Sequence, residues 1–456
     1  MHITVVGLGY VGLVTAACLA EWNHRVTGIE ADPNRVDALT SGRLPFHEPG
    51  LDDMVARHLD SGQLLLRNAS STADAVSNAD AVIVAVGTHD GNGGWQTETM
   101  RKALAGLVPH LRPGTPLIVR STLPPEFVTT LDRIVGKLRG RPTPDVPVLL
   151  NPEFTQEGRA LADFMKPSRV ICGVVHDPED AGVQLVRELY VATDAPFVVM
   201  PAIDASFSKL GSNLFLATKI SFANELAALC DAYGARVDTV VDAMAFDPRI
   251  GRAFLGAGAG FGGSCLPHQV TMTVKTARVA GLPTPLLAAV DEINQAQRAH
   301  LVGRVEELIA DLGGARIALL GLTFKPDTDD LRDSPALTVA TLLLERGASV
   351  VAYDPMTNAA ERAAGMISGL EIAGSIYEAL TDADGVVLVT DWAEFSDVDW
   401  AYARRLMRQA HVIDGRNFLD DRAVLDAGFS YTAFGRGRGR PLPAAINETR
   451  DAVEVA

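Results

Sequence analysis

The stretch that decides the fold reads His2-Ile3-Thr4-Val5-Val6-Gly7-Leu8-Gly9-Tyr10-Val11-Gly12-Leu13. A short β-branched run enters a Gly-x-Gly-x-x-Gly turn, and an Ala/Leu-rich helical pattern follows over about residues 14–22. Glycines in this order bring backbone N–H groups and a helix N-terminus to the pyrophosphate of a dinucleotide. The competing interpretation is a glycine turn in another kind of α/β protein.

A carboxylate follows the glycine turn at the distance that a dinucleotide site needs. Residues 26–29 are expected to form the second strand, and Glu30 stands at its end, close to the ~20-residue spacing of the acid that holds the adenosine ribose hydroxyls. An acid there favours NAD over NADP because it repels a 2′-phosphate. The predicted cofactor is therefore NAD, and the expected contacts are Gly7, Gly9, Tyr10, Val11, Gly12, Glu30, Arg35 and Thr88.

Composition excludes several classes of partner. The 456 residues carry a formal charge of −16 with no block of Lys or Arg, which argues against nucleic acid and against an anionic membrane surface. The four cysteines, Cys18, Cys172, Cys230 and Cys265, are widely spaced and show no metal-ligand pattern, so we expect reduced thiols and no metal. No apolar run reaches membrane-spanning length, and a strand begins directly after Met1, which predicts a cytoplasmic protein without a signal peptide.

The order of the expected elements predicts three domains. Strand-like runs at 81–86, 116–120 and 146–150 alternate with helical patterns, which is typical of a doubly wound parallel sheet. The turn-rich residues 89–94 follow the first of these runs and are expected to border the cofactor.

Residues 203–233 form a long helical pattern of ~45 Å, which is a weak indication of a dimer. Strands at 315–321, 349–354, 385–390 and 411–413, with a helix at 335–346, predict a second sheet. The expected fold class is α/β: two Rossmann-like domains, 1–200 for NAD and 301–436, joined by a helical domain, 201–300, with a flexible tail at 437–456.

One cysteine stands in a segment that cannot continue as a regular helix or strand. Gly260-Phe261-Gly262-Gly263-Ser264-Cys265-Leu266-Pro267 lets the backbone approach a ligand and holds the thiol in one place. A thiol in that setting is a candidate nucleophile. The alternative is a buried, inert cysteine in a glycine-rich connector.

Together, these motifs resemble the UDP-glucose/GDP-mannose 6-dehydrogenase family over nearly the whole chain. The matching motifs, in family order, are the glycine turn; His47-Glu48-Pro49-Gly50-Leu51; Arg120-Ser121-Thr122; Asn151-Pro152-Glu153-Phe154 through Glu157-Gly158; Lys209 through Asn213; Asp247-Pro248-Arg249-Ile250-Gly251; the Cys265 loop; and Gly321-Leu322-Thr323-Phe324-Lys325-Pro326 through Asp330-Leu331-Arg332-Asp333-Ser334-Pro335.

The resemblance implies a dimeric enzyme that oxidises a nucleoside-diphosphate-hexose at C6 to the acid and consumes two NAD. The second oxidation needs a tetrahedral intermediate, which a thiolate at Cys265 would supply by adding to the aldehyde; a thioester then forms and water cleaves it. Lys209 and Asn213 lie four residues apart on the long helix and would steady the developing oxyanion. The alternative for this pair is a solvated lysine beside a surface asparagine.

Further residues receive roles through the resemblance. Glu157 would be the base for thioester hydrolysis, with Thr122 holding the water, although Glu153 and Glu157 could also be plain acids at a helix start. Arg249, Lys325 and Arg416 would meet the substrate, or be surface ion-pair residues; Arg249 would reach into the partner subunit. The implied substrate contacts are Glu153, Phe154, Lys209, Asn213, Arg249, Phe254, Gly262, Lys325 and Arg416, and the cofactor contacts also include Thr122, Glu157 and Arg332.

The sequence departs from the family pattern directly after the cysteine. The family continues Cys-Leu-Pro-Lys-Asp, whereas this chain has Cys265-Leu266-Pro267-His268-Gln269. Gln269 takes the catalytic place of an aspartate but accepts no proton, and His268 is a titratable group that could substitute for it.

Three alternatives to a UDP-glucose enzyme stay open. The same chemistry could act on GDP-mannose or a TDP-linked hexose, because the base-selecting loops cannot be located from sequence. A nucleotide-sugar-binding protein impaired by Gln269 is the second alternative. A two-electron hydroxyacid dehydrogenase is the third, and it leaves Cys265 without a purpose.

Overall fold

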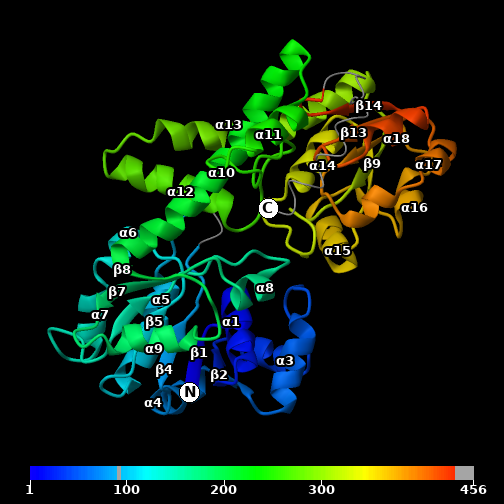
Figure 1. The fold of residues 1–456 in the computed structure, drawn as a ribbon. Helices are drawn as coiled ribbons and strands as arrows, with labels where there is room; N and C mark the ends of the chain where they lie inside the picture. The colour runs from blue at the N-terminus through cyan, green and yellow to red at the C-terminus, as the bar shows by residue number, and fades with distance from the viewer. Residues whose placement is uncertain (90–93, 437–456) are drawn as a thin grey trace. The chain divides into compact units, whose positions relative to one another are not determined.

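The computed structural model describes residues 1–89 and 94–436 and divides the chain into two compact units, Met1–Ser212 and Asn213–Ala456 (Figure 1). Each unit is built around one sheet, and helix α10, Ala202–Tyr233, begins in the first unit and ends in the second. The long helix expected at residues 203–233 is therefore confirmed.

The sheet of the first unit has eight strands in the order β3-β2-β1-β4-β5-β6-β7-β8. The strands are β1 His2–Val6, β2 Arg25–Glu30, β3 Leu64–Asn68, β4 Ala81–Val84, β5 Leu117–Val119, β6 Val148–Leu150, β7 Val170–His176 and β8 Phe197–Pro201. The sheet is mixed and not purely parallel as expected, because β7 runs antiparallel to β6. An apolar run in the sequence gives no strand direction; the path of the connection between two strands decides it.

Helices cover both faces of this sheet. One face packs against α1 Tyr10–Glu21, α3 Leu51–Asp60, α8 Ala160–Met165 and α9 Ala181–Leu189, and the other against α4 Thr72–Ser77, α5 Glu98–Leu107, α6 Pro125–Val128 and α7 Leu131–Leu138. Helix α2, Pro33–Thr40, follows β2. In β1, Val5 enters one core and Val6 the other. Burial on both faces explains why strands of this sheet read as continuous apolar runs.

The second unit joins a helical segment to a fully parallel sheet. After α10 come α11 Val237–Ala245, α12 Leu266–Val279 and α13 Pro285–Leu308, so that α13 passes residue 300, where a domain boundary was expected. The sheet order is β11-β10-β9-β12-β13-β14. Its strands are β9 Arg316–Leu320, β10 Ser349–Tyr353, β11 Leu370–Ile372, β12 Gly385–Leu388, β13 His411–Asp414 and β14 Ser430–Ala433.

The two faces of the second sheet carry separate cores. Helices α14 Pro335–Glu345 and α15 Thr357–Met366 pack on one face together with α13 and parts of α10 and α11. Helices α16 Ile376–Leu380, α17 Trp400–Leu406 and α18 Asp421–Asp426 belong to the other face. The central helices and the second sheet therefore share one hydrophobic core.

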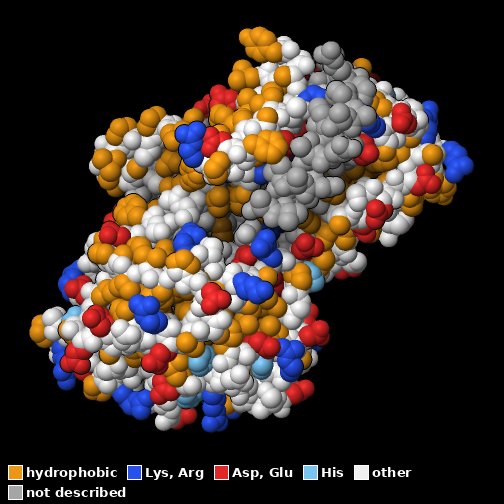
Figure 2. Space-filling view, in the orientation of Figure 1, with side chains coloured by type: hydrophobic (Ala, Val, Ile, Leu, Met, Phe, Trp, Pro, Cys, Tyr) orange, Lys and Arg blue, Asp and Glu red, His pale blue; other side chains and the backbone are white. Residues whose placement is uncertain are grey.

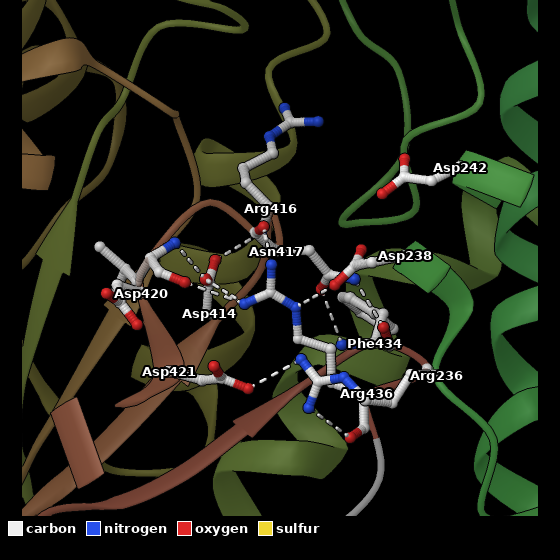
Figure 3. A network of polar contacts seen from close by, with 12 residues as sticks. Arg236, Asp238, Asp242, Asp414, Arg416, Asn417, Asp420, Asp421, Phe434 and Arg436 are labelled. Carbon is white, nitrogen blue, oxygen red and sulfur yellow. Dashed lines mark hydrogen bonds and ion pairs between the residues drawn. The ribbon is translucent and has the colours of Figure 1, made fainter. Parts of the chain in front are cut away.

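Arg436 is the last residue of the described part of the chain, and it is buried. Its guanidinium contacts Asp238 on α11 at 2.6 Å (Figure 3). It also donates to the hydroxyl of Tyr431 on β14 at 2.6 Å. The carboxylate of Asp414 lies 3.9 Å away. The expected tail at 437–456 and most of the expected cofactor-side turn at 89–94 lie outside the described residues. None of the helices within the described ranges is long and apolar enough to cross a membrane.

Candidate active site

The first unit builds the predicted dinucleotide turn between β1 and α1. Gly7 has φ +92°, and its N–H donates to the carbonyl of Ile29 at 2.8 Å. A Cβ at Gly12 would lie 1.8 Å from the carbonyl oxygen of Gly7, so only glycine fits there. Gly9, the N-cap of α1, differs: a Cβ at this position would meet nothing within 4 Å. The first amides of α1 therefore face open space, which is the room that a pyrophosphate needs.

Glu30 lies beside this turn at the carboxyl end of β2. Its carboxylate accepts from the backbone N–H of Leu8 at 3.0 Å and of Ala31 at 2.7 Å, and Arg35 Nη1 is 3.5 Å away. The structure thus brings the predicted acid, Arg35 and the glycine turn together. These residues fit NAD, which when bound supplies the hydride acceptor for an oxidation.

The glycine turn predicts opposite outcomes for two similar substitutions. Gly9→Ala should leave the thermal unfolding midpoint nearly unchanged, because its φ of −71° suits alanine, yet weaken NAD binding by at least about tenfold by filling the space over the helix N-terminus. Gly12→Ala should destabilise the first unit by more than about 2 kcal/mol through backbone overlap. Calorimetric NAD titration and thermal unfolding of both variants separate a loss of binding from a loss of fold.

The loops after β4 and β5 meet next to the glycine turn. Thr88 is buried and donates from Oγ1 to the carbonyl of Thr122 at 2.7 Å. Ser121 donates to the carbonyl of Val86 at 2.7 Å. A Cβ at Gly7 would be 2.7 Å from the carbonyl oxygen of Ala85, in the same loop. The predicted residues Thr88 and Thr122 therefore lie at the same sheet edge as the cofactor turn.

Lys209 and Glu153 form a buried ion pair in the first unit. The Lys209 Nζ lies 3.0 Å from Glu153 Oε1, and the two side chains are 5% and 10% exposed. Glu153 Oε2 accepts from the N–H and the hydroxyl of Thr155 at 2.8 and 2.7 Å. Burial raises the pKa of Glu153, but Lys209 and Thr155 outweigh burial and hold that pKa below its usual value. The lysine is therefore a fixed cation and not a solvated surface residue.

Two cationic side chains lie over the ring of Phe154. Lys209 Nζ lies 5.2 Å and the Arg169 guanidinium 3.8 Å from its centroid. Arg169 also donates to Ser212 Oγ at 3.1 Å. Burial lowers the pKa of Arg169. Arg169 belongs to none of the motifs quoted above, so the sequence carries no signal for this contact.

Glu48 is a buried residue of the quoted motif His47–Leu51 for which the sequence suggested no role. Its carboxylate accepts from the hydroxyl of Tyr10, and from the N–H groups of Gly158 at 2.7 Å and Ala160 at 2.6 Å. Burial, and then the carboxylate of Glu48, raise the pKa of Tyr10. Glu48 thereby fastens the loop that carries Glu157 to the first residue of α1, which links the predicted base to the cofactor turn.

The Glu153–Lys209 pair predicts a specific acid sensitivity. A carboxyl with a lowered pKa in the folded state stabilises the fold above its unfolded pKa of about 4.3, and this contribution is lost as pH falls through the folded pKa. Glu153→Gln should lower the stability of the first unit by about 3 kcal/mol at neutral pH, since Lys209 loses its buried carboxylate. Unfolding midpoints measured against pH should fall less steeply in acid for Glu153→Gln than for the wild type; parallel curves would contradict the prediction.

In the second unit, close backbone contacts clamp the Cys265 loop. Gly263 has φ +83°, and its N–H donates to the carbonyl of Arg332 at 2.9 Å. A Cβ at Gly262 would lie 2.4 Å from the carbonyl oxygen of Asp333, and a Cβ at Gly263 would lie 2.7 Å from the ring of Phe324. Cys265 itself is exposed and is the N-cap residue of α12, whereas the other three cysteines are buried. The loop therefore presents one thiol at the start of a helix.

Two arginines, the partly buried Arg416 and the buried Arg298, support the same loop. Arg416 donates to the carbonyls of Gly260 at 3.0 Å, Phe324 at 3.1 Å and Val389 at 2.6 Å. Arg298 on α13 donates to the carbonyl of Phe261 at 2.9 Å. Burial, and then the charge of Arg416, lower the pKa of Arg298 to about 10. The structure thus shows Arg416 holding backbone segments together, and its contact with a substrate stays a prediction.

Asn213 and Gln269 form a pair between α10 and α12. Asn213 Nδ2 donates to Gln269 Oε1 at 2.9 Å, and Gln269 is 1% exposed. Neither side chain changes its charge near neutral pH, so this pair orients an amide without carrying a proton. Lys209 is one turn earlier on the same helix. It lies in the first unit with Glu153, and the pair seen for Asn213 lies in the second.

The remaining predicted substrate residues of the second unit lie on loops. The Arg249 side chain is 88% exposed and contacts Asp247 at 2.6 Å. Phe254 adopts φ +64°, a left-handed conformation that is rare for bulky residues. Lys325 Nζ lies 5.4 Å from the ring centroid of Phe324. Arg332 contacts Asp330 at 2.6 Å and lines a cavity of about 360 Å³. No group of three or more His, Cys, Asp and Glu residues in the described part of the chain could hold a metal ion.

Known proteins resemble this chain in both of its units. Three segments match domains of the UDP-glucose/GDP-mannose dehydrogenase family: the NAD binding domain over residues 1–194, the central domain over 204–296 and the UDP binding domain over 318–421. The chain is 38% identical over 445 residues to the UDP-glucose 6-dehydrogenase of Rhizobium meliloti, covering 96% of this chain and 100% of the relative. It is also 38% identical over 453 residues to the UDP-glucose 6-dehydrogenase of Pseudomonas aeruginosa, covering 96% and 98%.

Solved structures give the same result. A UDP-glucose dehydrogenase from Pyrobaculum islandicum superposes with a TM-score of 0.85 at 34% identity, covering 94% of this chain and 96% of that one. A UDP-D-ManNAc dehydrogenase from Pyrococcus horikoshii superposes with a TM-score of 0.83 at 28% identity, covering 96% and 99%. With the NAD turn and the nucleotide-sugar domain both present, the chain belongs to the UDP-glucose/GDP-mannose dehydrogenase family and is an NAD-dependent nucleotide-sugar dehydrogenase.

Proposed function

We propose that this enzyme oxidises UDP-glucose at C6 to UDP-glucuronate through a thioester on Cys265. The observation that carries the proposal is the clamped loop, which exposes Cys265 at the start of α12 while the other three thiols are buried. A two-electron alcohol dehydrogenase has no use for such a thiol. An enzyme that must turn an aldehyde into an acid does, because the thiol creates the intermediate that releases the second hydride.

In the proposed reaction, the C6 alcohol first loses a proton and a hydride to become an aldehyde. The Cys265 thiolate then adds to the aldehyde carbon, and Lys209 and Asn213 stabilise the resulting oxyanion by charge and by hydrogen bonding. Loss of a second hydride converts the thiohemiacetal into a thioester. Glu157 takes a proton from water, the water oxygen attacks the thioester carbon, and the carbon–sulfur bond breaks to give the acid and the free Cys265 thiol.

In this reaction, Thr122 holds the water that cleaves the thioester, and Glu157 takes a proton from it. Support comes from the packing of the first unit: Thr122 accepts from Thr88 beside the cofactor turn, and Glu48 ties the loop after Glu157 to Tyr10. Both positions are thereby fixed relative to the predicted NAD site. Arg249, Phe254, Gly262, Lys325 and Arg416 are assigned to the nucleotide-sugar through the family motifs.

We propose UDP-glucose as the substrate, and not GDP-mannose or a TDP-hexose, because the relatives from Rhizobium meliloti and Pseudomonas aeruginosa are both UDP-glucose 6-dehydrogenases. The test is NADH release by the purified protein with NAD and each of UDP-glucose, TDP-glucose and GDP-mannose, counted per sugar consumed. Two NADH per UDP-glucose with an acid product is the expected result. One NADH per sugar would overturn the thioester route. Sugar-nucleotide binding without any NADH would instead identify a binding protein impaired by Gln269.

We further propose that the enzyme is a homodimer formed through α10. Phe207, Phe215, Phe222 and Leu229 recur every seven or eight residues along this helix, and each is between 46% and 64% exposed. This spacing places them on one face, an apolar stripe that a second copy would cover. Hydrophobic side chains also gather over the connection between α12 and α13 in Figure 2, where Leu282 and Leu286 are exposed.

The dimer proposal predicts that Phe222→Glu yields monomers, since a carboxylate in a buried apolar interface would lose its hydration. Sedimentation velocity should show the wild type at twice the mass of the variant. Phe246→Glu, on an exposed aromatic residue beyond α11, is the matched control and should remain dimeric. A monomeric wild type, or a dimeric Phe222→Glu, would contradict the proposal.

A further inference from the structure

His268 is the titratable residue next to the proposed nucleophile on the same helix. The N–H of Gln269 donates to the carbonyl of Cys265 at 3.0 Å, so that the helical hydrogen-bond pattern of α12 already starts at the cysteine. Residues three apart on a helix lie on one face, with about 5–6 Å between their Cβ atoms. The His268 side chain is 14% exposed and thus held within the protein.

A carboxylate orients this histidine from a separate segment. His268 Nε2 lies 3.4 Å from Asp333 Oδ2. Asp333 adopts φ +48°, a left-handed conformation that is uncommon outside glycine. The carbonyl of Asp333 packs on Gly262, where a Cβ would come within 2.4 Å. The residue that faces His268 is therefore also a residue that shapes the Cys265 loop.

The position that the family gives to an aspartate cannot move a proton here. Gln269 is buried and engaged with Asn213. Ser264 Oγ lies 3.7 Å from Cys265 Sγ, but a hydroxyl is too weak a base to ionise a thiol. A base whose ordinary pKa is near neutrality can accept the thiol proton at neutral pH, and imidazole is such a base.

We propose that His268, oriented by Asp333, is the base that accepts the proton of the Cys265 thiol. The S–H bond breaks, the proton moves to Nδ1, and the Nε2–H directs its hydrogen bond to the Asp333 carboxylate. The resulting imidazolium lies between the thiolate and the carboxylate, which stabilise its charge. His268 is thus a catalytic residue and Asp333 a positioning residue, an arrangement with the logic of a nucleophile, a base and an orienting acid.

Charged groups on the segments that pack near α12 do not replace His268. Around α12 they are Lys219 on α10, Asp291 and Arg298 on α13, and the Arg332–Asp330 pair before α14. Lys219 donates to the carbonyl of Ile250, and Arg298 to the carbonyl of Phe261. Arginine and lysine remain protonated at neutral pH and accept no proton, so none of these cations can be the base.

The test is the rate at which iodoacetamide alkylates Cys265, followed by mass spectrometry of its peptide as a function of pH. The buried Cys18, Cys172 and Cys230 serve as internal references. In the wild type, the rate should rise with an inflection below the ordinary thiol pKa of about 8.5. His268→Gln should move the inflection to that ordinary value and reduce the rate at about pH 7 at least tenfold. Asp333→Asn should give a smaller loss in the same direction.

The control is His300→Gln, which removes a histidine of α13 that contacts Gln297. Its alkylation profile should match that of the wild type. Superimposable profiles for the wild type and His268→Gln would overturn the inference, as would an equal shift in His300→Gln. Should His268→Gln fail to fold, the exposed position of Asp333 lets Asp333→Asn decide the question alone.

This inference rests on the proposed nucleophilic role of Cys265, and its failure is distinguishable from failure of that role. If Cys265 is the nucleophile but His268 is not its base, Cys265→Ser loses acid formation while alkylation of His268→Gln is normal. If the proposed reaction is wrong, the wild type gives no acid with any sugar nucleotide, whatever the alkylation profiles show.

Discussion

Cys265→Ser is expected to abolish acid formation, with kcat for the four-electron oxidation falling at least about 10³-fold, which corresponds to ~4 kcal/mol of transition-state stabilisation. The reason is that a serine hydroxyl stays protonated at neutral pH and adds to the aldehyde far less readily than a thiolate. The fold should be preserved, because Cys265 is exposed and its loop is held by glycine and arginine contacts instead.

Single-turnover measurements would show where the variant stops. The first hydride transfer needs no thiol, so one NADH should form and the aldehyde should accumulate, where hydroxylamine would trap it. Cys230→Ser, at a buried cysteine of the second unit, is the matched control and should keep the full stoichiometry. Normal acid release by Cys265→Ser would remove the thioester mechanism, while leaving the NAD and nucleotide-sugar domains as they are.

Arg436→Met is expected to give the largest loss of stability, about 3–5 kcal/mol in the free energy of unfolding of the second unit. Figure 3 shows why: the guanidinium lies between the carboxylates of Asp238 and Asp414. The guanidinium also donates to the carbonyl of Leu419 at 2.9 Å. Asp414 is fully buried, and burial raises its pKa despite the nearby arginine. Removing the cation leaves two buried carboxylates without their counterion.

Chemical denaturation followed by circular dichroism measures this effect. Asp238→Asn combined with Arg436→Met should recover part of the loss, because one buried charge disappears with its partner. Arg346→Met is the control: its ion pair with Glu306 is 35% and 46% exposed, so about 1 kcal/mol or less is expected. A loss below about 1 kcal/mol in Arg436→Met would show that the network adds little to stability.

The loss in Arg436→Met should also depend on pH. Without the arginine, burial still holds the pKa of Asp414 above that of the unfolded chain, where an aspartate titrates near about 3.9. The folded state then binds more protons than the unfolded state over that window, so the penalty appears as pH rises through it and shrinks in acid. An equal loss at about pH 4 and pH 7 would contradict this assignment.

Local patterns in the sequence were sufficient to predict the dinucleotide turn, the long helix and the central strands of both sheets. They did not reveal β3, β7, β8, β11 and β14. The glycines at positions 7 and 12 can be predicted from sequence, because residues nearby in the chain decide that only glycine fits. Gly7 has a positive φ, and a Cβ at Gly12 would overlap the carbonyl oxygen of Gly7. Hydrophobic periodicity likewise depends on neighbours along the chain, which is why α10 was expected at nearly its observed bounds. The family resemblance added the catalytic candidates, and their roles remain proposals.

Other features depend on residues far apart in sequence, and only the tertiary structure decided them. The reversed direction of β7, the role of Glu48 and the burial of Arg436 are of this kind. Glu48 meets a loop more than a hundred residues away, and Arg436 meets Asp238 on α11. A carboxylate or guanidinium has the same sequence signature whether it is solvated or buried. The sequence thus determined which elements and motifs exist, while packing determined which charges are buried and what each of them holds, because burial and long-range hydrogen bonds arise only when distant segments meet.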